Sequence, residues 1–298
     1  MNKIVVITGL TGSGKSSLAC FFAEKYNGEI VSVDSVQIYK GLNIGSAKES
    51  IETRQKIQHH LIDIKDFTET YNVSEFITDC LNAINNIIAR NKLPILVGGT
   101  GLYIKALLQG YSLGSASNEE FRALKQQEAQ ENGNMFVWEQ LNKLNPEKAA
   151  LVHPNNLKRV IRYLENETFG NLPSITSKPL DGFDVCSIGL IEDRESIYAK
   201  INTRVDQMLK EGLQAEVENL IKLGAKREHQ AMNSIGYKEW FDYYENKTHF
   251  NTTISLIKQH TRNYCKRQLT FLKTIPELTL CSVEQAKQKI EEFLNDNN

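Results

Sequence analysis

The sequence has no apolar run that approaches the length of a membrane-spanning helix. Its apolar runs are short, such as those at residues 4–7 and 95–97, and none comes near the about 20 residues that a span requires. The chain starts directly on a strand pattern, without the basic start, long apolar stretch and small-residue cleavage site of a signal peptide. We therefore expect neither a leader nor a membrane association.

Cysteine patterns that crosslink small domains or bind metals are also missing. The five cysteines are odd in number and widely spaced, and no C-x-x-C pair occurs, which argues against a disulfide framework and a zinc module. A reducing cytoplasmic location fits this usage. The 35 basic and 36 acidic residues nearly balance, so a nucleic-acid site would have to come from local clusters of charge.

The first hundred residues alternate strand and helix patterns. Apolar, β-branched runs at residues 3–8, 29–34 and 94–97 are typical of strands buried on both faces, and residues 16–26 and 74–90 are expected to be helices. This alternation predicts an α/β fold, with a P-loop NTPase-like parallel sheet flanked by helices and right-handed crossovers.

The pattern changes in the middle of the chain. Residues 113–182 are polar and helical, and three segments there have a helical period: 118–130, 135–144 and 155–167. A strand pattern returns and long helices follow it, at 184–191, 194–223, 235–244 and 253–273. We expect a catalytic core of residues 1–112 and 184–298, interrupted by a helical insertion at 113–183.

A phosphate-binding motif follows the first predicted strand. Its residues fit G-x-x-x-x-G-K-[ST] in order: Gly9, Leu10, Thr11, Gly12, Ser13, Gly14, Lys15 and Ser16. The motif lies between a strand and a helix, where backbone N–H groups and Lys15 can hold phosphate oxygens and the Ser16 hydroxyl can bind Mg²⁺. Such a P-loop is usually a nucleotide-binding, ATP-binding site, yet no apolar strand ends in the acidic pair that nucleotide hydrolysis normally uses.

Two polar residues follow other predicted strands. Asp34 ends the second strand, and Thr100 follows the strand at 94–97 and two glycines. Ligands of parallel sheets bind beyond the carboxyl ends of the strands, so both side chains should face the P-loop. Asp34 is a candidate general base or Mg²⁺ ligand, or else caps the next segment, and Thr100 could also cap a helix.

Arg204 stands out by its spacing. Ile197, Ile201, Arg204 and Met208 fall on one face of a predicted helix. A cation on an apolar stripe needs an anionic partner, because an unpaired buried charge is costly. That partner is either an internal carboxylate or a bound phosphate.

Several motifs occur together in one order along the chain. After the P-loop come Asp34 to Tyr39, Gly45 to Lys48, His59 to Asp63 and Gly98 to Tyr103, and later His153 to Asn155, Lys158 to Arg162, Ile235 to Glu239 and Thr261 to Gln268. This series resembles the tRNA dimethylallyltransferase (tRNA isopentenyltransferase, IPP transferase) family from about residue 4 to residue 273. The chain is similar to the bacterial type, which has no C-terminal zinc finger.

The resemblance implies a prenyl transfer to tRNA. A dimethylallyl group would pass from dimethylallyl diphosphate to the exocyclic amine of the adenosine on the 3′ side of the anticodon, and diphosphate would leave. The catalytic residues so implied are Asp34, Thr100, Lys15 and Arg204, with Mg²⁺ held at Ser16. The implied tRNA contacts are Asp34, Ser35, Val36, Gln37, Thr100, Arg122, Lys158, Arg159, Val160, Ile161, Arg162, Asn233, Ser234, Ile235, Gly236, Tyr237 and Lys238. The implied partner is the tRNA anticodon stem-loop, bound by a monomer.

Basic residues cluster at two places despite the neutral total. Lys258, Arg262 and Lys266 form one ridge of a predicted helix within an acid-free stretch, 258–273, that also holds Arg267 and Lys273. Lys158, Arg159 and Arg162 form a second cluster. Such clusters are either solvated helix faces or contacts to RNA phosphates.

His59, His60 and Asp63 lie close to one another in the sequence. We expect them to have structural roles rather than to be metal ligands.

Two other functions remain open at this point. A P-loop kinase of small molecules or nucleosides would use the same loop with an aspartate base, but it would not explain the basic clusters or the motif series. A non-catalytic RNA-binding protein would not need Lys15, Ser16, Asp34 and Thr100 together.

Overall fold

The computed structural model describes residues 1–110, 118–170 and 178–296. These residues form two compact units: the sheet unit, Met1–Leu108 with Pro179–Asn298, and the helical unit, Gln109–Lys178. We expected the insertion at residues 113–183. The boundary expected between residues 112 and 113 lies outside the described residues, and the helical unit ends at Lys178 rather than at residue 183.

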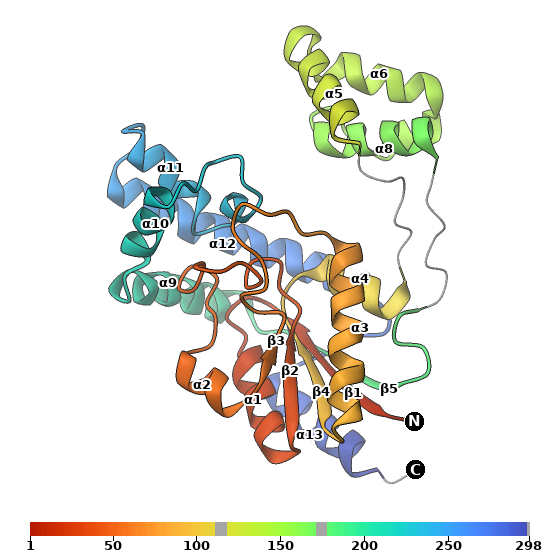
Figure 1. Cartoon of the computed structure of the whole chain (residues 1–298), viewed down its shortest axis with the longest axis vertical. Coiled ribbons are helices and arrows are strands. Elements are labelled where there is room, and N and C mark those ends of the chain that lie inside the picture. The colour runs from red at the N-terminus through yellow and green to blue at the C-terminus, as the bar shows by residue number, and fades with distance from the viewer. Residues whose placement is uncertain (111–117, 171–177, 297–298) are drawn as a thin grey trace. The chain divides into compact units, whose positions relative to one another are not determined.

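The sheet unit contains the predicted α/β fold (Figure 1). Its described strands are β1 (Lys3–Gly9), β2 (Gly28–Ser32), β3 (His59–His60), β4 (Leu93–Val97), β5 (Asp184–Leu190) and β6 (Thr279–Cys281). Their order in the sheet is β3-β2-β4-β1-β5-β6, and every strand pair is parallel. The central strand β1 is almost entirely buried, as its β-branched run predicts.

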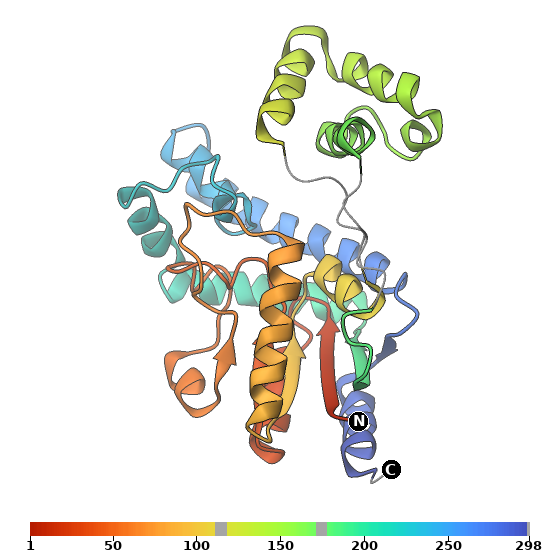
Figure 2. The same ribbon diagram turned by 45° about the vertical axis from the view of Figure 1, so that its right-hand side comes forward.

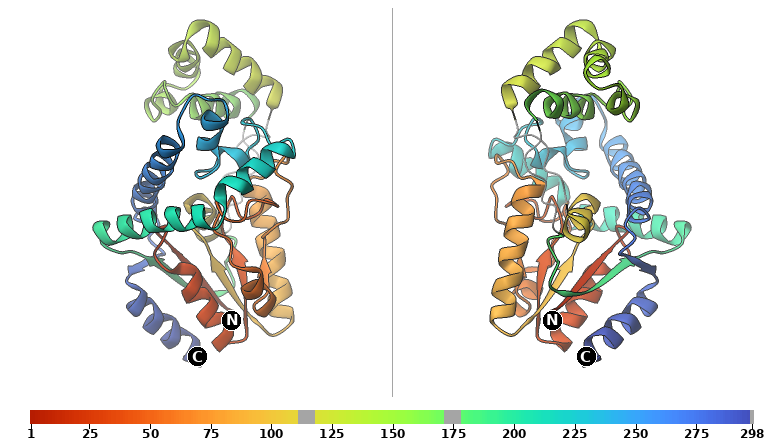
Figure 3. Two further views of the ribbon diagram at one scale, coloured as in Figure 1. Left: turned by 90° about the vertical axis from the view of Figure 1, so that its left-hand side faces the viewer. Right: turned by 90° about the vertical axis from the view of Figure 1, so that its right-hand side faces the viewer.

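Helices cover both faces of this sheet (Figures 2 and 3). The helices described in the sheet unit are α1 (Lys15–Lys25), α2 (Ile51–Lys56), α3 (Val73–Ala89), α4 (Gly101–Gln109), α9 (Arg194–Lys210), α10 (Leu213–Lys222), α11 (Lys238–Tyr244), α12 (Phe250–Leu272) and α13 (Val283–Asn295). One apolar core joins α1 and α13 to the strands, through Phe22 and Ile290 among others. The other face is covered by α3, whose Phe76 and Ile84 are fully buried.

Several predicted element boundaries are wrong. A continuous helix was expected at 194–223, but Gly212, with a φ of 100°, separates α9 from α10 because a left-handed residue cannot continue a helix. Helix α11 begins only at Lys238, because Gly236 has a φ of 94°. The sequence patterns did not indicate β6 or α13.

The helical unit has its own core. It contains α5 (Glu119–Asn132), α6 (Asn134–Leu144), α7 (Pro146–Ala150) and α8 (Leu157–Phe169). Val137, Leu141 and Leu164 are buried together, and Trp138 donates its indole N–H to the carbonyls of Ala149 and Val152 at 3.1 and 2.9 Å. Among the helices in the described ranges, none combines the length and apolar character needed to cross a bilayer.

The carboxyl ends of β1, β2 and β4 meet at one edge of the sheet. Val33 N–H donates to the Val97 carbonyl at 2.8 Å, and Gly98 N–H donates to the Ile7 carbonyl at 3.2 Å. The segments that follow these strands therefore start side by side. They are the P-loop, the Asp34 turn and the turn before α4.

Candidate active site

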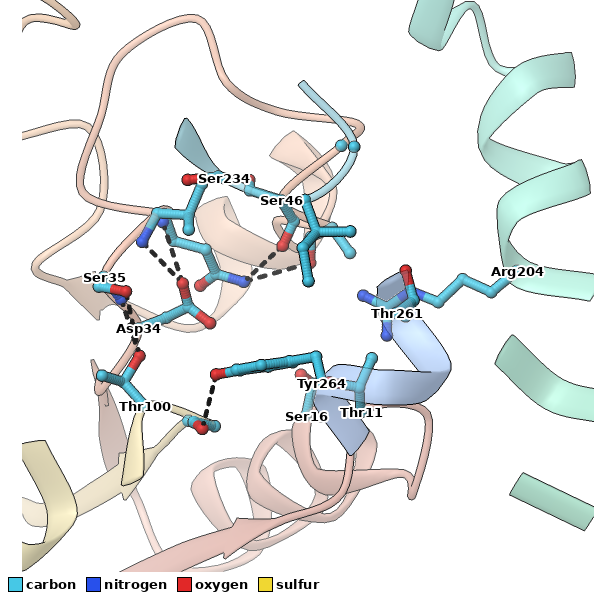
Figure 4. A pocket seen from close by; sticks show the side chains of 18 of the residues that line it. Thr11, Ser16, Asp34, Ser35, Ser46, Thr100, Arg204, Ser234, Thr261 and Tyr264 are labelled. Atoms are coloured by element: carbon cyan, nitrogen blue, oxygen red, sulfur yellow. Dashed lines mark hydrogen bonds between the residues drawn. The ribbon is translucent and has the colours of Figure 1, made fainter. Parts of the chain in front are cut away.

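A cavity of about 440 Å³ opens at this edge (Figure 4). Its walls come from the P-loop, the turn at 34–37, the segment 45–49, the turn at 98–100, the segment 233–238, α9 and α12. Asp34 and Thr100 lie on the side opposite Arg204, which extends from α9. The structure thus brings together side chains that are far apart in the sequence.

The P-loop closes around its lysine. Ser13 N–H and Lys15 Nζ both donate to the carbonyl of Leu10, at 3.1 and 2.9 Å. Gly14 takes the left-handed conformation directly before α1 and makes no side-chain capping bond, so the first N–H groups of the helix are left for a ligand. Burial lowers the pKa of Lys15 to about 8, helped by the positive charge of Arg204 and opposed by Asp34. A lysine in this setting is stabilised by a bound anion.

Arg204 makes no direct ion pair in the part of the chain that the structure describes, although the carboxylates of Asp34, Glu49 and Glu211 attract it from a greater distance and oppose the lowering of its pKa by burial. No ion pair or hydrogen bond joins it to another described residue, although it lines the cavity beside Lys15 and Ser16. Of the two partners expected from the sequence, an internal carboxylate in direct contact is therefore not observed among the described residues. Two cations facing one cavity, together with a helix N-terminus, form a site for a multiply charged anion.

Asp34 combines the two roles that the sequence left open. Its Oδ1 accepts hydrogen bonds from the backbone N–H groups of Val36 and Gln37 at 2.8 and 3.3 Å, as a capping residue does. The other oxygen, Oδ2, makes no hydrogen bond to a described residue, and the side chain lines the cavity. One oxygen thus fixes the carboxylate while the other is available to a ligand.

Thr100 connects the end of β4 to the Asp34 turn. Its Oγ1 accepts from Ser35 N–H at 3.0 Å and donates to Ser35 Oγ at 3.3 Å. The same residue precedes α4, so it lies both at the helix start and at the cavity, as predicted.

Some residues implied as tRNA contacts form hydrogen bonds within the sheet unit or are buried in it. The Gln37 amide accepts from Ser32 Oγ at 3.0 Å and donates to the carbonyls of Ser46 and Ala47, both at 3.3 Å. Tyr237 is fully buried. Ser35, Val36, Asn233, Ser234, Ile235, Gly236 and Lys238 line the cavity.

The Tyr237 hydroxyl belongs to a hydrogen-bond network beside the cavity. It donates to Glu216 Oε1 at 2.8 Å and accepts from Ser46 N–H at 3.2 Å. The Glu216 carboxylate also accepts from the backbone N–H groups of Asn43, Ile44 and Gly45. These bonds tie α10 to the segment before Lys48, a link that the sequence did not indicate.

The helical unit uses two of its predicted tRNA-binding arginines internally. Arg122 donates to both oxygens of the buried Glu165, at 2.9 and 2.8 Å, and Arg162 pairs with the same carboxylate. Val160 and Ile161 belong to the core of this unit, so their side chains support α8 and do not present groups to a ligand. Lys158 and Arg159 are exposed, and Arg159 donates to Tyr163 Oη at 2.7 Å.

The predicted basic ridge on α12 also contains both side chains with internal partners and exposed side chains. Lys258 pairs with Asp206 at 2.6 Å, and Arg262 donates to Asn202 Oδ1 at 2.7 Å, so both contact α9. Lys266 is exposed, and its ammonium group makes no hydrogen bond to another described residue. Arg267 lies 5.7 Å from the ring of Tyr264, at the cavity.

The two histidines have structural partners. His60 Nε2 lies 2.7 Å from Glu29 Oε2, and His59 Nδ1 lies 2.7 Å from the Ile57 carbonyl. Asp63 pairs with Lys48 and Arg54. In the described ranges, no three His, Cys, Asp or Glu side chains gather as metal ligands would.

The comparison with known families gives a match over most of the chain. A sequence model of the family described as IPP transferase matches residues 37–275. A tRNA dimethylallyltransferase of Exiguobacterium sp. is 44% identical over 275 residues, 91% of this chain and 87% of the relative. One of Geobacillus thermodenitrificans is 41% identical over 98% of this chain and 95% of the relative.

Solved structures are similar over nearly the whole chain. The full-length tRNA isopentenylpyrophosphate transferase of Bacillus halodurans is 36% identical, with a TM-score of 0.73 over 99% of this chain and 96% of that chain. A eukaryotic dimethylallyltransferase, described in crystallographic snapshots as acting on tRNA, is 27% identical. Its TM-score is 0.80 over 100% of this chain and 81% of that chain.

Proposed function

The chain belongs to the IPP transferase family, and from this membership and the geometry of its cavity we propose the reaction that it catalyses. It is a tRNA dimethylallyltransferase: it moves the dimethylallyl group of dimethylallyl diphosphate to the exocyclic amine of the adenosine 3′ to the anticodon, and diphosphate leaves. The observation that carries this proposal is the meeting of Lys15, Arg204, Asp34 and Thr100 in one cavity.

The anion site would hold the leaving group. The P-loop N–H groups, Lys15 and Arg204 bind the diphosphate and stabilise the charge that grows on it as the carbon–oxygen bond breaks. Because the cradle binds phosphate oxygens and needs no adenine or ribose, a prenyl diphosphate can occupy it in place of ATP. Prenyl transfer then requires no nucleotide.

Asp34 would receive the proton of the attacking amine. The adenine amine is a weak nucleophile, so its orientation toward the prenyl carbon contributes as much as the removal of its proton. As the carbon–nitrogen bond forms, the proton moves to Asp34 Oδ2, while Oδ1 remains held by the turn. The adenine must first leave its stack in the RNA, which costs roughly a few kcal/mol.

The cavity also suits Mg²⁺. The Ser16 hydroxyl lines the cavity and makes no hydrogen bond to another described residue. A hydroxyl oxygen beside diphosphate oxygens is the kind of ligand set that Mg²⁺ takes in phosphate sites. When bound, the ion would neutralise part of the charge on the diphosphate.

The tRNA would reach the cavity along exposed basic groups. The exposed members of the two predicted clusters are Lys158, Arg159, Lys266, Arg267 and Lys273. Exposed cations can contact RNA phosphates without breaking internal ion pairs. Ser35, Ser234 and Lys238 line the cavity where the flipped adenine would enter. The anticodon stem-loop of tRNA is therefore the partner, and we propose that the protein acts as a monomer in the cytoplasm.

The test is the mass of the modified nucleoside. The protein is incubated with dimethylallyl diphosphate, Mg²⁺ and unmodified tRNA, and the digested tRNA is analysed by mass spectrometry. We expect the adenosine 3′ to the anticodon to gain one dimethylallyl group. A kinase would instead leave the adenosine unchanged and consume ATP when a phosphate acceptor is added, and no observation on this chain favours that alternative.

A further inference from the structure

One face of α12 packs against the turn that carries Thr100. Tyr264, Gln268 and Phe271 are spaced i, i+4 and i+7, so they share this face. Tyr264 Oη donates to the Gly99 carbonyl at 3.1 Å, and Gln268 Nε2 donates to the same carbonyl at 3.0 Å. A Cβ on Gly101 would lie only 2.5 Å from the Phe271 ring, so the helix and the turn are in close contact.

The Gln268 amide also holds the P-loop. Its Oε1 accepts from Thr11 N–H at 2.9 Å and from Thr11 Oγ1 at 3.1 Å. The side chain is buried, with only 5% of its residue surface exposed, so water does not replace these bonds. One amide therefore spans from the loop after β1 to the turn after β4.

This bridge lies next to the reacting groups. A Cβ built on Gly99 would be 2.6 Å from Gln268 Nε2 and 3.9 Å from Lys15 Nζ. Gly99 is followed by Thr100, whose Oγ1 accepts from Ser35 N–H beside Asp34. Hydrogen bonds, joined by the peptide link between Gly99 and Thr100, thus lead from the P-loop through Gln268 to the turn of the proposed base.

We propose that Gln268 is a positioning residue, whose amide sets the distance between the P-loop that holds the diphosphate and the Gly99–Thr100 turn that orients the acceptor. This inference rests on the proposed function. A side-chain amide suits this position because its oxygen must accept hydrogen bonds from Thr11 and its nitrogen must donate one to the Gly99 carbonyl. Glutamate would place a second acceptor against the Gly99 carbonyl, methionine would make neither bond, and asparagine is one methylene too short.

The first test is Gln268→Met, which keeps the length of the side chain. We expect kcat at saturating tRNA and donor to fall about 10–100-fold, because a displacement of about 1 Å can cost that much in rate. The KM for tRNA should stay within about twofold, since Gln268 does not face the exposed cations. Gln259→Met is the matched control, because Gln259 is exposed on the same helix. It should leave both constants unchanged.

A double-variant cycle separates positioning from a general loss of stability. If Gln268 acts through the Thr100 turn, Gln268→Met should cost less than about threefold once Thr100→Ala is present, because coupled residues are not additive. Fully multiplicative losses in the folded double variant would overturn the proposal. If circular dichroism shows that Gln268→Met does not fold, Gln268→Glu, which keeps the acceptor for Thr11, is measured in its place with the same expectation.

Hydrogen exchange gives a readout that does not depend on turnover. The backbone amide of Thr11 should exchange faster in Gln268→Met than in wild type, and at the wild-type rate in Gln259→Met. Unchanged exchange together with wild-type kcat would refute the bridge. A wild-type protein that transfers no prenyl group, but whose Thr11 amide still responds to Gln268→Met, would instead refute the proposed function alone.

Discussion

The affinity of the P-loop for a prenyl diphosphate should fall as the pH rises above 8. Burial and the charge of Arg204 lower the pKa of Lys15 to about 8 in the protein without ligand. The protonated lysine is the form that binds an anion, so affinity is complete well below pH 8 and is lost as the pH rises through this value. Each further pH unit should weaken binding about tenfold, until the higher pKa of the complex is reached.

Arg204 sets part of this pH dependence. Replacing it in Arg204→Met removes a charge that lowers the pKa of Lys15, so the fall in affinity should begin at a higher pH. The same change removes a charged contact to the diphosphate. At pH 7 this loss should weaken binding by roughly 10–150-fold, which corresponds to the about 1.5–3 kcal/mol of a charge-assisted hydrogen bond.

The assay is calorimetric titration of dimethylallyl diphosphate into the protein with Mg²⁺ and without tRNA, from pH 6.5 to 10. Lys15→Met is the control, because without the lysine the affinity should be weaker and nearly independent of pH. A wild-type affinity that is constant between pH 7 and 10 would refute the assignment of Lys15. A pH profile unaltered by Arg204→Met would refute its coupling to Arg204.

Three further expectations concern the base, the RNA surface and the helical unit. Asp34→Asn retains the Oδ1 acceptor of the turn but removes the base, so kcat should fall roughly 10²–10⁴-fold with little change in donor affinity, as steady-state kinetics would detect. Lys266→Gln should flatten the log–log salt dependence of tRNA binding by about 0.7–0.9, whereas Lys258→Gln, which removes a partner of Asp206, should leave that slope unchanged. Glu165→Gln removes the charge that holds two arginines and should destabilise the helical unit by about 1–3 kcal/mol, seen as faster hydrogen exchange in α5 and α8 but not in β1.

The sheet and the convergence of its loops could be predicted from local patterns. Buried parallel strands are continuous β-branched runs, and the carboxyl-end rule alone brings Asp34 and Thr100 to the P-loop. The isolated cation on the apolar face of α9 likewise predicted an anionic partner for Arg204, and a bound anion at this place stays a prediction. These features are local in sequence or follow from topology.

Other features depend on partners that are distant in sequence. Gln268 and Thr11 are 257 residues apart, and Glu216 and Gly45 are 171 apart, so no local pattern indicates either contact. The conformation of Gly212 depends on how α9 and α10 pack, which the helical period does not reveal. Arg122 was assigned to tRNA from the family resemblance, while its bidentate pairing with Glu165 is not visible in the sequence.

The most direct measurement follows both products of the reaction with no nucleotide present. The purified protein is mixed with dimethylallyl diphosphate, Mg²⁺ and unmodified tRNA, and the prenylated adenosine and the released diphosphate are both quantified. We predict one diphosphate for each prenylated adenosine, at the same rate with or without ATP. A strict requirement for ATP, or release of orthophosphate in step with product, would contradict the assignment of the P-loop to the prenyl diphosphate.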